Sequence, residues 1–100
     1  MKLTTVNKKH YRSLGHKLKP VVMIAGKGLT DNVHEEINRA LDDHELIKIK
    51  LNIDDPSARR EMAAAICQAH SAELIQSIGK IILILREAEK PKARLSNLLR

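Results

Sequence analysis

Short apolar runs alternate with longer segments of helical periodicity, and this alternation constrains the fold more than any other feature of the sequence. The run Leu46–Leu51 has a period of two, which predicts a strand with lysines on one face and aliphatic side chains on the other. Ile81–Leu85 is apolar throughout, which predicts a central strand buried on both faces. We expect two further strands, a short buried one over 20–25 and one over 73–77 that leads into a tight hairpin.

The intervening segments carry helix signals. Thr4 or Thr5 can cap a first helix that runs to about Leu18. Thr30 and Asp55 are suitable caps for a second and a third helix. The order helix, strand, helix, strand, helix, strand, strand predicts an α/β fold, a two-layer domain with a mixed four-stranded sheet. Strands separated by a helix should run parallel, and the last two strands should form an antiparallel hairpin.

One hundred residues suit a single folded domain, which we place at 1–86. Residues 87–100 are of mixed composition and are expected to form a basic, flexible tail. Cys67 is the only cysteine, so no internal disulfide can form. The sequence contains no apolar run of membrane-spanning length and no signal-peptide centre. These features predict a cytoplasmic protein with no membrane association.

The distribution of charge is more informative than the net charge of +6. Residues 1–30 contain seven basic and no acidic residues, whereas the remaining seventy contain eleven basic and twelve acidic residues. Such a one-sided segment favours a polyanionic partner, because unopposed cations repel one another unless an anion is recruited. The alternative is a basic N-terminal helix whose lysines serve only solubility.

Aromatic residues are almost absent, since Tyr11 is the only one. Proteins that read single strands by stacking bases on aromatic rings need several such residues. The composition therefore favours binding through phosphates and sugars, with a strong salt dependence and modest sequence specificity.

The junction between the expected first strand and second helix contains a glycine turn, Ala25-Gly26-Lys27-Gly28. Glycine allows close approach of a ligand to the backbone, and a helix N-terminus offers free N–H groups to an anion. A purely structural turn between strand and helix is the alternative interpretation. The spacing does not match a nucleoside-triphosphate loop.

Four runs together resemble the CRM domain family, named for chloroplast RNA splicing and ribosome maturation. These are LGHKLKPVV at 14–22, GLT at 28–30, HELIKIK at 44–50 and QSIGK at 76–80. The resemblance covers about residues 3–86. Within the family, the sequence is similar to the bacterial stand-alone form, the YhbY type. It implies a fold similar to the C-terminal domain of translation initiation factor three. It also implies RNA binding and association with precursors of the large ribosomal subunit.

The resemblance further implies that a GxxG loop binds the RNA backbone, and this loop falls on residues 25–28. Ala25 stands where the family has its first glycine, whereas Gly28 is retained. If the first position requires a positive φ, Ala25 would be strained there. Lys27 adds a cation to the same loop.

Both lines of reasoning lead to one set of candidate RNA-binding residues, each of which has an ordinary solvated side chain as its alternative interpretation. The set is Lys17, Lys19, Ala25, Gly26, Lys27, Gly28, Lys48, Lys50, Lys80 and Arg86.

Signs of catalysis or metal binding are weak. The five histidines are scattered without metal-ligand spacing, and no cofactor or metal is expected. Cys67 and His70 are three residues apart on the third helix, but helix packing explains them better than nucleophilic chemistry. We therefore predict a protein that is not an enzyme and has no small-molecule substrate. The predicted partner is ribosomal RNA in large-subunit precursors, and the alternative is a module whose basic face binds an acidic protein.

Overall fold

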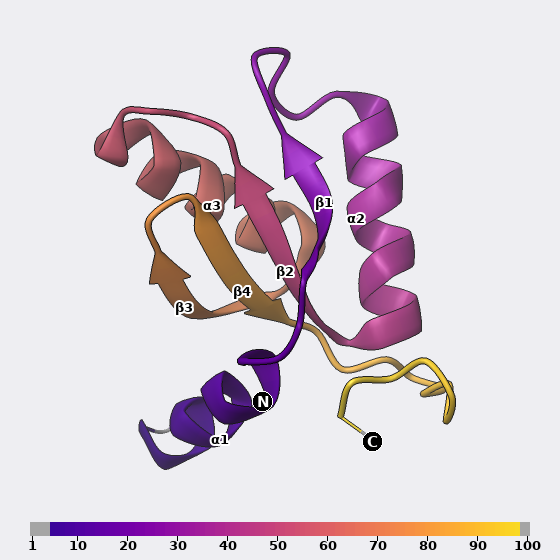
Figure 1. Cartoon of the computed structure of the whole chain (residues 1–100). Coiled ribbons are helices and arrows are strands. Elements are labelled where there is room, and N and C mark those ends of the chain that lie inside the picture. The colour runs from indigo at the N-terminus through magenta and orange to yellow at the C-terminus, as the bar shows by residue number, and fades with distance from the viewer. Residues whose placement is uncertain (1–4, 99–100) are drawn as a thin grey trace.

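The computed structural model describes residues 5–98, with side chains from Asn7 onward (Figure 1). Residues 1–4 and 99–100 lie outside the described residues. They include the proposed cap Thr4, the start of the predicted domain 1–86 and the end of the predicted tail 87–100. The elements follow the predicted order. They are α1 (Thr5–Gly15), β1 (Pro20–Ile24), α2 (Asp31–His44), β2 (Leu46–Leu51), α3 (Pro56–His70), β3 (Glu73–Ile78) and β4 (Ile81–Leu85).

The four strands form one mixed sheet in the order β1-β2-β4-β3. β1 runs parallel to β2, whereas β4 is antiparallel to both of its neighbours, β2 and β3. This arrangement confirms the mixed four-stranded sheet and the central position of β4. The hairpin between β3 and β4 turns at Gly79, whose φ of +56° favours glycine.

Local capping chemistry sets the starts of α2 and α3. The Thr30 hydroxyl accepts a hydrogen bond from the Val33 amide at 3.2 Å. The Asp55 carboxylate accepts one from the Ala58 amide at 3.0 Å. Both caps are confirmed, because each side chain satisfies an N–H that has no partner within its helix.

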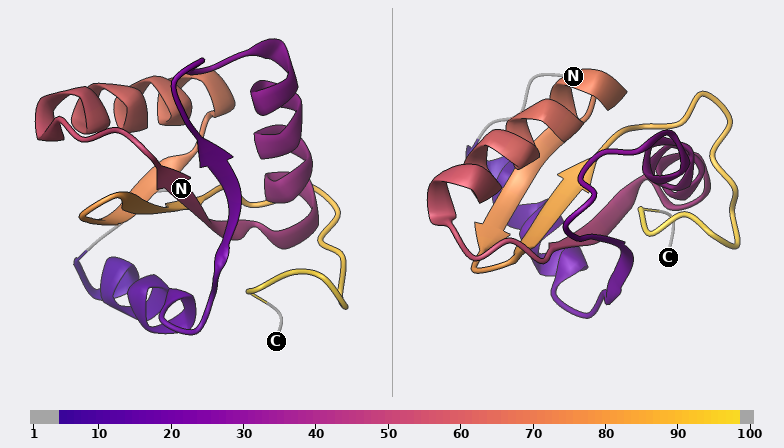
Figure 2. Two further views of the ribbon diagram at one scale, coloured as in Figure 1. Left: turned by 45° about the horizontal axis from the view of Figure 1, so that its top comes forward. Right: turned by 90° about the horizontal axis from the view of Figure 1, so that it is seen from above.

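Helices cover both faces of the sheet. The structure therefore has three layers, one more than the predicted two-layer arrangement. α2 and α3 pack on one face over a core that includes Ile24, Ile37, Ile49 and Ile66. α1 lies on the opposite face, where Tyr11, Leu14 and Leu18 pack against a smaller cluster of sheet residues (Figure 2). The sequence pattern could not distinguish these layers, because amphipathicity shows that a helix has a buried face but not which side of a sheet it covers.

The helix α1 ends at Gly15, earlier than the expected Leu18, and packs very closely on the sheet there. A Cβ atom at Gly15 would lie 2.5 Å from Cδ2 of Leu83, which is too short for two non-bonded carbon atoms. The Leu18 amide donates to the Gly15 carbonyl at 3.0 Å, which turns the chain toward β1. The glycine therefore allows α1 to lie directly on β4.

Residues 87–98 are packed against the domain, which differs from the flexible tail that the sequence predicted (Figure 1, yellow). The buried carboxylate of Glu45 accepts hydrogen bonds from the Ser96 hydroxyl at 2.6 Å and the Ala88 amide at 2.8 Å. The Asn97 side chain donates to the Leu46 carbonyl at 2.7 Å, and Lys92 pairs with Asp43. The segment thus packs against the carboxyl end of α2 and the start of β2. Its partners are about fifty residues away in sequence, so no local pattern could reveal them.

Candidate nucleic-acid interface

The loop between β1 and α2 is a tight turn stabilised by its own backbone. The Gly28 amide donates to the Ala25 carbonyl at 2.9 Å, and the Thr30 amide donates to the Gly28 carbonyl at 3.1 Å. Gly28 has a φ of +68°, so it is the position in this turn that favours glycine. Ala25 is not among the residues with positive φ. Replacement of the family glycine by Ala25 therefore introduces no backbone strain.

Gly26 is the exposed corner of the turn, and local geometry does not require glycine there. Its φ is not positive, and a Cβ atom built on it would meet no atom within 4 Å. Gly26 and Lys27 are both exposed. The absence of a side chain at Gly26 leaves the backbone open to close approach by a ligand, with the Lys27 ammonium beside it.

This turn and two other connections lie at the same end of the sheet, as backbone hydrogen bonds between them show. The Asn52 amide donates to the Ile24 carbonyl at 2.8 Å, and the Leu51 amide donates to the Lys80 carbonyl at 2.6 Å. The β1–α2 turn, the segment after β2 and the β3–β4 hairpin are therefore neighbours. Lys27 and Lys80, far apart in sequence, therefore lie at the same end of the sheet.

Lys80 differs from Lys27 because it already has an anionic partner. Its ammonium lies 2.8 Å from a carboxylate oxygen of Asp54, whose side chain is 98% exposed. The Lys80 hydrogen bond and charge lower the pKa of the Asp54 carboxyl below its usual value. This pair is fully accessible to solvent on the Asp54 side, so a phosphate could compete with the carboxylate for Lys80.

Lys48 and Lys50 project from β2 on the face that α1 partly covers. Lys48 is the register partner of Leu83, which belongs to the apolar cluster under α1, and Lys50 follows two residues later. Neither ammonium makes a hydrogen bond or ion pair with any residue that the structure describes. The same holds, within residues 5–98, for the exposed Lys17, Lys19 and Lys27.

Lys17 and Lys19 lie in the connection from α1 to β1, near the end of the sheet opposite the turn. Lys19 immediately precedes Pro20, the register partner of Lys48. The unpaired lysines therefore extend from the α1–β1 connection along β2 to the turn at 25–28. Of the predicted set, Lys48 and Lys50 share one face of the sheet, and Lys27 lies in the turn after the neighbouring strand β1.

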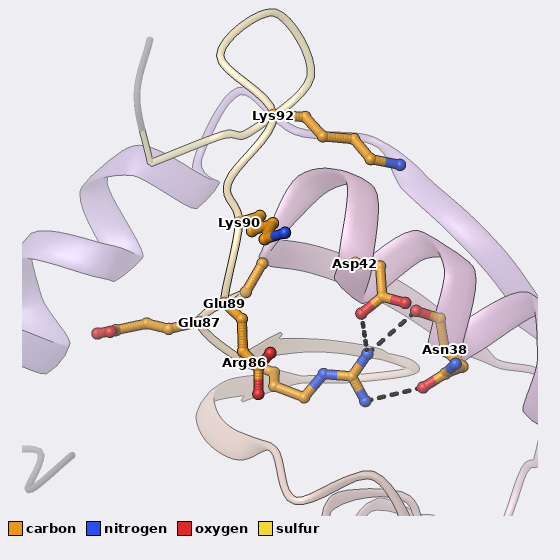
Figure 3. Close-up of a pocket in the computed structure, with 8 residues that line it drawn as sticks. Asn38, Asp42, Arg86, Glu87, Glu89, Lys90 and Lys92 are labelled. Atoms are coloured by element: carbon orange, nitrogen blue, oxygen red, sulfur yellow. Dashed lines mark hydrogen bonds and ion pairs between the residues drawn. The ribbon is translucent and has the colours of Figure 1, made fainter.

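Arg86 occupies a different place from the other candidates. Its guanidinium donates to the Asn38 side chain at 3.0 Å and to Asp42 at 2.8 Å (Figure 3). It also donates to the His70 carbonyl at 3.2 Å. The side chain is only 19% exposed and connects β4 to both α2 and α3. This geometry assigns Arg86 to the stability of the fold, at the end of β4 opposite to Lys80.

The helix and strands nearest to the unpaired lysines contain no carboxylate. Among the described residues, α1, β1, β2 and β4 contain no Asp or Glu. The acidic side chains come from α2, α3, the first residue of β3 and the connecting segments. At the carboxyl end of α2, Glu45 is buried and Asp42 and Asp43 are paired with cations. Two exposed carboxylates lie closer to the turn at 25–28, because Asp31 begins α2 and Asp54 pairs with Lys80.

The sequence missed that β1 is exposed on one face. A continuous apolar run predicted a buried strand, but Val21 and Met23 are 53% and 59% exposed. β1 lies at the edge of the sheet, and only Val22 and Ile24 face the core under α2 and α3. A uniform apolar run carries no period, so only the sheet order could reveal this surface.

The remaining titratable side chains offer little chemistry. Burial raises the pKa of the Cys67 thiol to about 11, so the reactive thiolate is scarce at neutral pH. Between α2 and α3, Nδ1 of His34 lies 2.9 Å from Nε2 of His70, within hydrogen-bond distance. Within residues 5–98, no three potential metal ligands of the His, Cys, Asp and Glu types gather at one place. In the same range, no helix combines the length and apolar character that crossing a bilayer requires.

Comparison with known proteins identifies the family. The sequence matches the CRS1 / YhbY (CRM) domain over residues 3–86, which is most of the chain. The chain belongs to the CRM family. A CRM relative in Pseudomonas aeruginosa, named a probable RNA-binding protein, is 46% identical over all of this chain and 96% of its own length. One in Haemophilus influenzae, named an RNA-binding protein, is 40% identical over 93% of this chain and 94% of its own length.

A solved structure supports the same assignment. The solution structure of a hypothetical protein from Staphylococcus aureus is 32% identical to this chain and superposes with a TM-score of 0.78. The match covers 89% of this chain and 93% of the other. The CRM resemblance and the mixed α/β fold expected from the sequence are thus confirmed.

Proposed function

We propose that this CRM protein is a non-catalytic RNA-binding domain that contacts the RNA backbone through the turn at 25–28 and the adjoining lysines. The proposed contacts are Lys17, Lys19, Lys27, Lys48, Lys50 and, by displacement of Asp54, Lys80. Its proposed place of action is the cytoplasm, where it associates with ribosomal RNA in precursors of the large subunit. The names of its relatives as RNA-binding proteins support the RNA partner.

One observation carries this proposal. Lys48, Lys50 and Lys27 have no anionic partner among the described residues, and the strands they belong to or follow contain no carboxylate. Ordinary protein surfaces mix the two signs, which neutralises their field at short range. An unneutralised row of cations beside an open backbone turn suits the regularly spaced phosphates of a nucleic acid.

Arg86 stays outside the proposed contact surface, because its guanidinium donors are engaged by α2 and α3. The turn is the part of the surface that provides backbone donors, since Gly26 leaves its neighbourhood open. Lysines on a sheet face contact phosphates without reading base edges. We therefore expect this surface to position RNA by charge and shape, with strong dependence on salt.

Binding assays across a salt series test the proposal. A fragment of large-subunit ribosomal RNA and a DNA duplex of equal length would be titrated with the protein at several salt concentrations. We expect tighter binding to the RNA and an affinity that falls steeply with salt. Equal binding to the DNA duplex, or an affinity that does not change with salt, would overturn the proposed surface.

The cellular part of the proposal has its own test. Lysate would be separated on a sucrose gradient, with and without prior nuclease treatment, and the protein would be located by immunoblot. We expect co-migration with immature large subunits that is lost after nuclease treatment. Association that survives nuclease treatment would indicate a protein partner and contradict the proposed RNA contact.

A further inference from the structure

A row of side chains crosses the whole sheet on the face that α1 only partly covers. Met23 on β1 is in register with Lys50 on β2, and Lys50 is in register with Ile81 on β4. Ile81 is in register with Ile78 on β3. Residues opposite one another in a sheet project to the same face. These four residues, the cross-sheet row, therefore form a continuous strip.

The cross-sheet row is open to solvent at both ends. Met23 is 59% exposed and Ile78 is 64% exposed, the two largest values among the exposed large apolar side chains of the described residues. The cluster that α1 covers consists of Leu46, Ile75, Leu83 and Leu85, which lies toward the opposite end of the sheet. Next to the row, Lys48, Gln76 and Leu83 line a shallow hollow together with Ile78 and Ile81. Exposed apolar surface of this kind marks a contact site more often than chance.

The charge of the row decides what it can bind. A second copy of this chain would place Lys50 and Lys48 against the same lysines across a two-fold axis, and like charges that close repel. An anionic partner has no such penalty. The row also adjoins the candidate interface. Met23 lies two residues before Ala25 in the turn, and the amide of Leu51, which follows Lys50, donates to the carbonyl of Lys80, which precedes Ile81.

We propose that the cross-sheet row takes unpaired nucleobases of RNA, so that the protein prefers single-stranded or looped segments to continuous duplex. This inference rests on the proposed function and adds a base-binding surface to it. The faces of nucleobases are flat and apolar and would lie on Met23, Ile81 and Ile78. The phosphates that connect these bases would lie at Lys50 and Lys48.

This surface needs no aromatic side chain. Aromatic rings give most single-strand binders their stacking platforms, and this sequence contains only Tyr11. Tyr11 is half-buried in the contact between α1 and the sheet. Apolar and sulfur-containing side chains such as Ile and Met also contact unstacked bases. The row therefore supplies base contacts that the aromatic count alone had argued against.

An RNA chain without bases separates base contacts from phosphate contacts. A short single-stranded oligoribonucleotide and an abasic ribose-phosphate chain of the same length would be titrated with the wild-type protein by fluorescence anisotropy. The same titrations would use the double variant Met23→Ser, Ile78→Ser, whose sites are exposed and tolerate polar residues. The control is Leu74→Ser, an exposed apolar residue on the same strand as Ile78 that faces the α3 side.

We expect the wild type and the Leu74→Ser control to bind the base-containing chain more tightly than the abasic one, by about fivefold or more. The double variant should lose this preference while its affinity for the abasic chain stays the same. The Lys27→Gln variant should bind both chains more weakly and keep the preference. Equal binding of both chains by the wild type, or a preserved preference in the double variant, would overturn the inference.

Two further outcomes are distinguishable. If neither chain binds at any salt concentration, the proposed function fails, and this inference fails with it. If the double variant binds RNA normally but loses binding to an acidic amphipathic peptide, the row belongs to a protein partner and the inference is wrong.

Discussion

The carboxylate of Glu45 and the hydroxyl of Ser96 form a buried hydrogen bond of 2.6 Å between residues that are 51 positions apart. Glu45 is 2% exposed and Ser96 is fully buried. Glu45 ends α2 with a φ of +64°, a conformation in which glycine is the usual residue. A glutamate at this position has a backbone cost, and its side chain offsets that cost by holding residues 88–98 against the domain.

Replacement of Ser96 by Ala should weaken this attachment. The buried carboxylate would lose one donor, and the Leu98 amide would lose the hydroxyl to which it donates at 3.1 Å. We expect the free energy of unfolding to fall by roughly 1–3 kcal/mol, with faster hydrogen exchange at Leu98. Urea denaturation and amide exchange measure these effects. The control Ser77→Ala changes an exposed serine and should stay within about 0.5 kcal/mol of wild type. Equal stability of the two variants would contradict this account of the tail.

The two glycines of the turn should respond differently to alanine. Gly28→Ala places a side chain at a φ of +68° and should destabilise the fold by about 1–2 kcal/mol. Gly26→Ala adds a methyl group in open space, so its thermal midpoint should match or exceed that of wild type. Its affinity for RNA should fall severalfold, because the methyl group hinders approach to the backbone. Thermal denaturation and RNA titration check the pair; unchanged RNA affinity in Gly26→Ala would exclude close contact at the turn.

Removal of the Asp54 carboxylate should strengthen RNA binding. In Asp54→Asn, Lys80 loses its ion-pair partner and a negative charge disappears from the edge that holds Lys27. We expect an affinity about two- to fivefold higher at low salt, with a steeper dependence on salt. Glu61→Gln, an exposed position on α3, removes the same charge away from this edge and serves as the control. A result in which both variants bind alike would show that net charge, rather than the local pairing, sets the affinity.

Acid should destabilise the fold through His70. Burial, and then the nearby His34 and Arg86, lower the pKa of His70 below 6.5. The unfolded chain therefore binds more protons than the folded chain in the window below pH 6.5, and stability falls as the pH drops through it. We expect the urea midpoint to decrease between about pH 7.5 and about pH 5, and to decrease less in His70→Gln. An identical pH dependence in wild type and variant would assign the effect to other groups.

Local signals predicted most of the fold. Thr30 and Asp55 act as caps, and the bounds of β2 and β4 match the runs that predicted them, because capping and strand periodicity are encoded within a few neighbouring residues. The face of the sheet that α1 covers and the docking of residues 87–98 depend on partners distant in the chain. Sequence periodicity contains no information about such contacts.

The sequence indicated only part of the geometry of the candidate site. Lys50 lies beside Met23, two residues before the turn at 25–28, and the contact of these residues with RNA stays a prediction. Arg86 could not be distinguished from them by sequence, because its acceptors on α2 are more than forty residues away. The exposure of Met23 and Ile78 follows from the edge positions of β1 and β3, which the order of elements does not determine.

The dependence of RNA affinity on salt tests the central claim most directly. The triple variant Lys27→Gln, Lys48→Gln, Lys50→Gln would be compared with wild type and with a charge-matched control at exposed positions, Arg39→Gln, Arg60→Gln, Lys90→Gln. Each unpaired lysine should contact one phosphate, so the slope of log affinity against log salt should become shallower by about two in the first variant. The control should keep the slope of wild type. Equal slopes for the two triple variants would contradict the proposal that RNA binds along β2 and the turn at 25–28.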